Sequence, residues 1–197
     1  MCSISKSIGI LTAAAFLLLG CSSTQLTCHT RGMEPPWCKN GLHGSTVAVY
    51  WDTAWRRDQK EIERRETLFA KEIGVFFGTN ECVKTVRIAR SIGNKPISMC
   101  TDAEIASDAR ASGADKAIVM RLEELGPNLM LYLSPILWQT QNEVLLRTKV
   151  LDSRDGSIVT DTVSHWYRGG PFLLLGTRSL HKDIDGTLEA LFLGGGK

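Results

Sequence analysis

The sequence predicts an α/β (α+β) domain with a single mixed sheet of about five to six strands and two to three helices packed on it, in the order β-α-β-α-β-β-β-β-α. Apolar runs alternate with helix-period stretches in the first half, and turn residues separate short alternating runs in the second. The composition, 43% hydrophobic and 22% charged, is typical of a globular domain. Lys+Arg 23 against Asp+Glu 21 argues against a nucleic-acid surface, and a mean hydropathy of -0.05 excludes a polytopic membrane protein.

The first predicted strand and helix lie in the segment after residue 45. Thr46–Trp51 is a β-branched and aromatic run typical of a buried strand. Asp52 then offers an N-cap for a helix that reaches about Phe77. A functional role for Asp52 is the alternative, because strand ends in α/β sheets commonly carry functional residues. The apolar stripe of this helix consists of Ile62, Phe69, Ile73 and Phe76.

A second strand, a short helix and a third strand are predicted next. The second strand spans Val83 to Ile92. Thr101 and Glu104 have the spacing of a capping box, which opens a short helix that Gly113 ends. Ala114 to Leu125 follows as a strand whose apolar residues occupy both faces, which indicates a central position in the sheet.

The second half of the domain is predicted to be a meander of strands. Gly126-Pro127-Asn128 is predicted to be a turn, followed by a fourth strand over Leu129–Leu133. The fifth and sixth strands, Glu143–Leu151 and Ile158–Tyr167, flank a hairpin turn at Ser153–Gly156.

A final helix closes the predicted domain of residues 45–193. Gly169-Gly170-Pro171 is predicted to end the meander, and a helix then begins at Ser179. Residues 194–197 are predicted to be a flexible tail. The apolar stripe of this helix consists of Leu180, Ile184, Leu188, Leu191 and Phe192.

Residues 1–20 have the layout of a secretory signal peptide: Lys6 precedes an apolar run from Ile8 to Leu19. The end of this run, Leu18-Leu19-Gly20-Cys21, resembles the bacterial lipobox. That resemblance implies a diacylglycerol on Cys21, cleavage before it, and acylation, for example by palmitate, of the new amino terminus. Because no Asp follows Cys21, it also implies sorting to the outer membrane. Residues 21–44, rich in Ser, Pro and Gly without periodicity, are predicted to be a lipidated tether.

Four cysteines, Cys28, Cys38, Cys82 and Cys100, are left after Cys2 is removed and Cys21 is acylated. An even number in an oxidising compartment predicts two disulfides, for which three pairings exist. We favour Cys28–Cys38 and Cys82–Cys100, because each closes a short irregular segment. The alternative is a metal site made by Cys28, His29, Cys38 and His43, although the separation of its cysteines exceeds the usual zinc spacing.

The predicted order of elements resembles a periplasmic fold shared by several bacterial envelope proteins. They include the curli-secretion and exopolysaccharide-export lipoproteins, the peptidoglycan-synthase activator lipoproteins and the amino-terminal domain of the Tol β-propeller protein. The resemblance rests on Asp102–Leu125, where the helix-ending Gly113-Ala114-Asp115 leads into a strand, and on the strand and turn of Val150–Gly156. It implies a role in assembly or binding and provides no catalytic residues to carry over.

The sequence offers few catalytic signals, since motifs for a nucleophile elbow, a phosphate loop or a zinc protease are absent. We therefore expect no catalytic residue, no cofactor and no metal, with His165 as the remaining candidate for a base. The stretches Tyr132–Trp138 and Trp166–Leu175 are unusually apolar and aromatic. Their residues Trp138, Trp166 and Phe172 are the partner-binding candidates, and burial by the last helix is the alternative.

These observations together predict an outer-membrane-anchored lipoprotein on the periplasmic face that acts as a non-catalytic binding or assembly component of the cell envelope. Its expected partners are the membrane, through the lipid anchor, and an envelope protein or further copies of the chain, but no nucleic acid. The alternative is a periplasmic hydrolase or metal-dependent enzyme that uses the Cys28/His29/Cys38/His43 cluster or His165.

Overall fold

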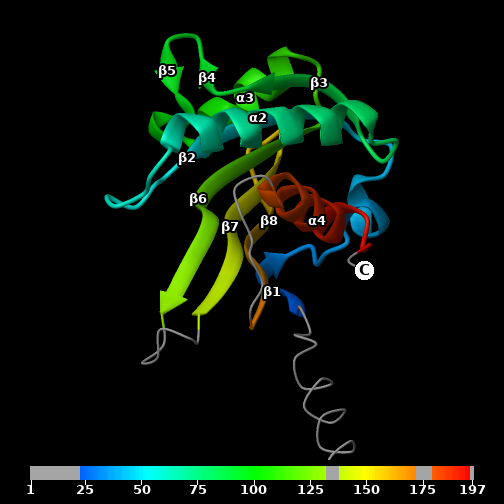
Figure 1. Cartoon of the computed structure of the whole chain (residues 1–197). Coiled ribbons are helices and arrows are strands. Elements are labelled where there is room, and N and C mark those ends of the chain that lie inside the picture. Colours follow the sequence, from blue (N-terminus) through cyan, green and yellow to red (C-terminus); the bar gives the residue numbers. More distant parts are fainter. Residues whose placement is uncertain (1–22, 132–137, 172–178, 196–197) are drawn as a thin grey trace, which may run out of the picture.

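A computed structural model describes residues 23–131, 138–171 and 179–195 of the chain (Figure 1). One six-stranded mixed sheet has the strand order β1-β8-β7-β6-β2-β3. Helices α2 and α4 cover one face, and α3 lies on the other. The predicted fold class is therefore confirmed. The strands and helices are β1 (Ser23–Gly32), β2 (Thr46–Thr53), α2 (Ile62–Thr79), β3 (Lys84–Ala89), β4 (Ser91–Ile92), β5 (Lys95–Pro96), α3 (Asp102–Ala111), β6 (Lys116–Leu131), β7 (Trp138–Asp152), β8 (Ile158–Pro171) and α4 (Leu180–Phe192), with short helical turns η1 (Cys38–Leu42) and η2 (Ile97–Met99).

One side of the sheet, β6-β2-β3, is parallel, because β2 lies between β3 and β6 and runs in the same direction as both. Alternate residues of β2 enter two separate cores. Val47 and Val49 pack in the larger core under α2 and α4, whereas Ala48 and Tyr50 pack in the smaller core under α3. The Tyr50 hydroxyl also donates a hydrogen bond of 2.6 Å to a carboxylate oxygen of Asp108 on α3, which holds that helix to the sheet.

Several locally coded features occur where the sequence predicts them. Thr101 and Glu104 form the capping box at the start of α3. Gly113, with φ +81°, follows that helix, and Gly156, with φ +76°, lies in the hairpin turn between β7 and β8. The predicted apolar stripe of α4 is buried throughout. Among the described residues, no helix combines the length and apolarity needed to cross a membrane.

Helix α2 begins later than predicted, so the expected capping role of Asp52 is wrong. The helix starts at Ile62, and Asp52 is a buried residue of β2 whose carboxylate pairs with Arg121 of β6 at 2.9 Å. Ile62, predicted to face the core, is 39% exposed. Asp52 is held by a strand neighbour that is remote in sequence, so no local pattern could have revealed its partner.

The predicted turn at Gly126-Pro127-Asn128 is also wrong, because β6 continues through it to Leu131. Gly126 pairs with Glu143 and Pro127 with Asn142 in the register of β7. β2 pairs with β6 only as far as Leu122, so the outer part of β6 is an edge strand, where proline is tolerated. The third and fourth predicted strands are therefore one long strand. In the same way, β8 runs through Gly169 to Pro171, where we expected the meander to end.

Part of the predicted tether is a strand of the sheet. β1 pairs antiparallel with β8 along its whole length, from Ser23 opposite Gly169 to Gly32 opposite Thr160. Leu26 and Cys28 on one face of β1 are half-buried, and the opposite face is exposed. An edge strand covered on only one face has a weak hydrophobic pattern, which explains why the sequence does not reveal it.

The cysteines pair differently from the prediction. Cys38 in η1 is bonded to Cys82 after α2, and Cys28 and Cys100 are free thiols. The favoured Cys28–Cys38 and Cys82–Cys100 disulfides are therefore wrong. Trp37, fully buried against Phe192 of α4, holds the η1 segment at the end of α2 and so brings Cys38 to Cys82.

Candidate functional site

β1 starts at the end of the sheet where β6 ends, β7 starts and β8 ends (Figure 1). Ser23 pairs with Gly169, and Pro171 at the end of β8 pairs with Gln139 of β7. β6 and β7 extend further, to the pair Leu131 and Trp138. In the sequence, Cys21 precedes Ser23, the first residue of β1, by two residues.

At this end of the sheet, β6 and β7 come from an uncharged part of the sequence. From Gly126 to Asn142 the chain has no Asp, Glu, Lys or Arg. The ends of β6 and β7, including Trp138, belong to this stretch. Phe172 and the segments 132–137 and 172–178 lie outside the described residues, so the partner-binding role of Trp138 and Phe172 stays a prediction.

A buried polar cluster fixes α4 over this end of the sheet, and sequence reasoning missed it. The Asp183 carboxylate on α4 is 1% exposed. It accepts from Arg168 Nη2 at 3.0 Å and from Asn142 Nδ2 at 2.5 Å. Arg168 of β8 lies opposite Asn142 of β7, so the two donors come from paired strands. The only sequence signal is an Asp on the apolar side of a predicted helix.

Trp166 belongs to this cluster and not to an exposed surface. Its side chain is 6% exposed, and its indole nitrogen donates to Asp183 at 3.3 Å. The ring lies against Gly186 of α4, where a Cβ would come within 2.8 Å of it. This corrects its assignment as a partner-binding candidate: burial by the last helix, the alternative, describes Trp166.

The α3 face of the sheet carries a row of ion pairs beside a small cavity of about 120 Å³. Arg121 pairs with Asp52, Lys149 with Asp102 at 3.0 Å, and Arg147 approaches Glu123 at 3.4 Å. The hydrogen bond to Asp52 raises the pKa of Arg121. Because each cation has a carboxylate beside it, this row has no excess charge with which to attract an ionic substrate.

His165, the candidate base, contacts the Glu143 carboxylate across β8 and β7. The two residues occupy diagonal positions of the antiparallel pair, since His165 is opposite Leu145 and Glu143 opposite Tyr167. Within the described residues, His165 has no other hydrogen-bond partner, so the structure brings no nucleophile to it. The contact has the geometry of an ordinary cross-strand pair.

The candidate metal site of Cys28, His29, Cys38 and His43 is not assembled. Cys38 is bonded to Cys82 in a disulfide, so it has no thiolate with which to bind a metal ion. Cys28 and His29 line a hollow beside β8, whereas His43 lines a different hollow beside α2 and α4. In the part of the chain that the structure describes, no group of three or more His, Cys, Asp and Glu could hold a metal ion.

No protein-family model matches this sequence, and a search of curated proteins finds no match. Solved structures of remote similarity include the PelC dodecamer of Paraburkholderia phytofirmans, with 16% identity and a TM-score of 0.46 over 85% of this chain and 97% of that chain. The hypothetical protein CT253 of Chlamydia trachomatis has 11% identity and a TM-score of 0.48 over 77% and 99% of the two chains. Lipoprotein GNA1162 of Neisseria meningitidis has 11% identity and a TM-score of 0.43 over 70% and 91%. Because these identities and TM-scores are low, the proposed function rests on the sequence and the geometry of this chain alone.

Proposed function

We propose that this chain is an outer-membrane lipoprotein, anchored through Cys21 on the periplasmic face, whose domain is a non-catalytic binding or assembly component of the cell envelope. It would contact an envelope protein or further copies of itself. The observation that carries the proposal is the position of β1, which begins two residues after the lipobox cysteine and is paired with β8 from its first residue.

This position implies a close attachment to the membrane. Two residues of extended chain span at most about 7 Å. An acyl anchor on Cys21 would therefore hold the end of the sheet near the bilayer. The uncharged ends of β6 and β7 extend past Ser23 in the same direction, which suits an apolar or interfacial surface. Each buried methylene contributes about 0.8 kcal/mol, so two or three acyl chains anchor stably.

The contacts of the candidate catalytic groups support a binding role rather than a chemical one. Asp52 forms an ion pair with Arg121, His165 contacts Glu143, and Cys38 is disulfide-bonded to Cys82. Each of these side chains therefore has a structural partner in place of a catalytic one.

The anchor is tested by expressing the full chain in a Gram-negative host and measuring the mass of its amino-terminal peptide. We expect cleavage before Cys21, the mass of a diacylglycerol and an added acyl chain, and outer-membrane density in a sucrose gradient. The matched control is Cys21→Ala, which is expected to lose both the added mass and the membrane fraction. An unmodified Cys21 in the wild-type chain would overturn the anchor.

A further inference from the structure

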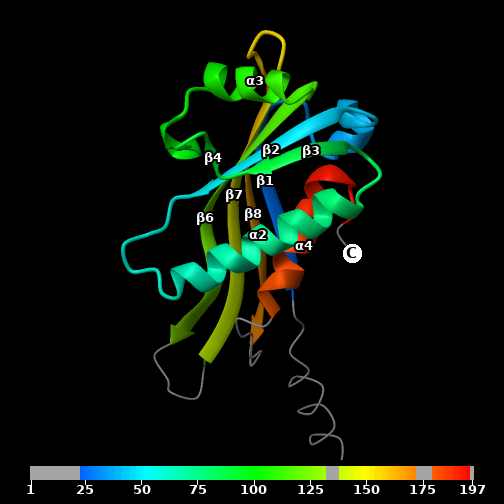
Figure 2. The same ribbon diagram turned by 90° about the horizontal axis from the view of Figure 1, so that it is seen from above.

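Helices α2 and α4 lie side by side on one face of the sheet (Figure 2). Their carboxyl-terminal halves and η1 surround a groove of about 530 Å³. Val75 and Thr79 on α2 are four residues apart and so share one helix face. Asp185 and Glu189 on α4 and Leu193, the residue that caps its carboxyl end, follow the same spacing. The groove therefore has two helical walls, each presenting side chains at one-turn intervals.

The groove exposes apolar surface. Val75 is 51% exposed and Leu193 is 41% exposed, and both line the groove. Phe76 and the Cys38–Cys82 disulfide line the groove between them. Covering such side chains with a partner would remove apolar area from water, which is favourable by about 25 cal/mol per Å².

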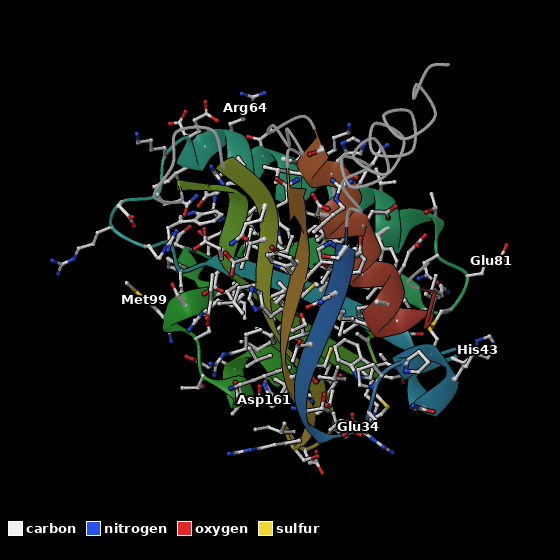
Figure 3. The ribbon with its side chains drawn as sticks, turned by 60° about the horizontal axis from the view of Figure 1, so that its bottom comes forward. Glu34, His43, Arg64, Glu81, Met99 and Asp161 are labelled. Carbon is white, nitrogen blue, oxygen red and sulfur yellow. A yellow bond between two sulfur atoms is a disulfide. The ribbon has the colours of Figure 1, made fainter. Side chains whose placement is uncertain are left out.

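Carboxylates that have no ion-pair partner among the described residues also line the groove. Glu81, Asp185 and Glu189 line it, and none of the three is in an ion pair within the described residues. Some carboxylates elsewhere on the surface are ion-paired, for example Asp152 with Lys116 and Glu104 with Lys95. Lys39 and His43 are the basic residues of the lining. Figure 3 shows Glu81 and His43 on the same side of the molecule, next to the carboxyl-terminal end of α4.

The floor of the groove is held in place by covalent and aromatic contacts. The disulfide joins η1 to the segment after α2. Phe192 of α4 packs against Trp37 and Phe77, with ring centroids 4.9 Å and 5.2 Å apart. A partner would therefore meet a preformed surface and would order little of this chain on binding.

We propose that this groove binds an amphipathic helix of an envelope partner protein whose aliphatic stripe is flanked by Lys and Arg side chains. Two adjacent helical walls fit a third helix better than an extended peptide, which would need an open sheet edge. The uncompensated carboxylates select a cationic partner and disfavour an acidic one. This inference deepens the proposed binding role and is independent of the lipid anchor.

The test places a photo-crosslinking amino acid at Val75 or at Leu193 of the full chain in the bacterium that produces it. The control position is Ile158, a 53% exposed apolar residue at the start of β8 and outside the groove. We expect adducts from Val75 and Leu193 but not from Ile158. Mass spectrometry of the crosslinked peptide should reveal an aliphatic stripe between Lys or Arg residues of another protein.

Charge reversal then tests the electrostatic selection. The double variant Asp185→Lys/Glu189→Lys should reduce the adduct about tenfold, which corresponds to 1.4 kcal/mol of binding free energy. Both residues are exposed, and Lys near the end of α4 suits the helix dipole, so the variant should fold with an unchanged melting temperature. The matched control is Glu63→Lys at the other end of α2, which should leave the adduct unchanged.

Three outcomes would overturn the inference: no adduct from the groove, an adduct whose peptide is acidic or comes from a second copy of this chain, or an adduct insensitive to the double reversal. Adducts from Ile158 alone would reject the groove as the binding site and would leave the proposed binding role standing. The absence of adducts at all three positions would count against both.

Discussion

The guanidinium of Arg65 on α2 lies directly against the backbone of Gly126 in β6. A Cβ on Gly126 would stand 1.9 Å from Arg65 Nη1, so any side chain there must displace the guanidinium. Arg65 is buried at 7% exposure, and its Nε donates to the Lys60 carbonyl oxygen at 2.8 Å. Burial lowers the pKa of Arg65, and the nearby Glu124 carboxylate partly opposes that effect. The glycine of β6 thus makes room for a buried cation that anchors the start of α2.

Gly126→Ala is expected to reduce the free energy of unfolding by about 2 kcal/mol, because the methyl group must displace the buried guanidinium. Urea denaturation followed by tryptophan fluorescence measures the loss. In an Arg65→Ala background the same substitution should be nearly neutral, since the obstructing group is gone. Equal losses in both backgrounds would show that Arg65 is not the cause.

The Cys38–Cys82 disulfide closes a loop with a sequence separation of 44 residues. On the chain-entropy model, Cys38→Ser/Cys82→Ser should cost about 4 kcal/mol of unfolding free energy. Cys28→Ser and Cys100→Ser should cost much less, because both cysteines are free thiols. A thiol titration of the denatured, unreduced chain should find the thiols of Cys28 and Cys100. Finding neither would contradict their assignment as free thiols.

Asp183 is a buried carboxylate whose removal should be strongly destabilising. Asp183→Asn leaves the Arg168 guanidinium, 23% exposed, without its counter-charge, and we expect a loss of about 3 kcal/mol. Because Trp166 donates to the same carboxylate, its fluorescence emission should also shift. Asp185→Asn, two residues along α4 and exposed to solvent, is the matched control and should be close to neutral. A loss of the same size in both variants would contradict the role of the buried cluster.

Glu66 is predicted to make stability depend on pH. Burial alone would raise the pKa of Glu66, but hydrogen bonds from Arg90, Thr53 and Trp55 outweigh it and hold the pKa below its ordinary value of 4.5. A carboxyl group with a lowered folded-state pKa contributes stability that is fully present above its unfolded-state pKa and is lost as pH falls through the folded-state value.

Glu66→Gln should therefore be about 1 kcal/mol less stable than the wild type at pH 7, because a neutral acceptor binds Arg90 more weakly than a carboxylate. The difference should shrink as pH falls below 4.5 and vanish once Glu66 is protonated in the folded wild type. Urea denaturation at a series of pH values measures it, with the exposed Glu81→Gln as control. If the stability deficit of Glu66→Gln does not change with pH, the charge of Glu66 is not its cause.

Much of the fold was predictable because its signals are local. The capping box of Thr101 and Glu104 depends on residues three apart, and the turn at Gly156 depends on one left-handed glycine. The apolar stripe of α4 repeats every three or four residues and is buried as predicted. Such patterns lie within one element, where backbone geometry alone decides which side chains share a face.

The candidate sites were less predictable because their members are far apart in sequence. Asp52 was expected to cap the following helix, but its partner, Arg121, is 69 residues away. For Trp166 the sequence left a partner interface and burial by the last helix both open, and the structure shows that Gly186 and Asp183 of α4 cover it. The groove beside the disulfide depends on how α2, α4 and η1 meet, which no single segment encodes.

The sequence by itself predicted the three helices, most of the strands and the resemblance of the segment before Cys21 to a lipobox, since each depends on neighbouring residues. The tertiary structure alone decided that Cys38 bonds to Cys82, that β1 joins the sheet, and that β6 continues past Pro127. Each of these outcomes depends on contacts between distant segments. The free energy of such contacts comes from packing and pairing across the fold, which a local pattern does not contain.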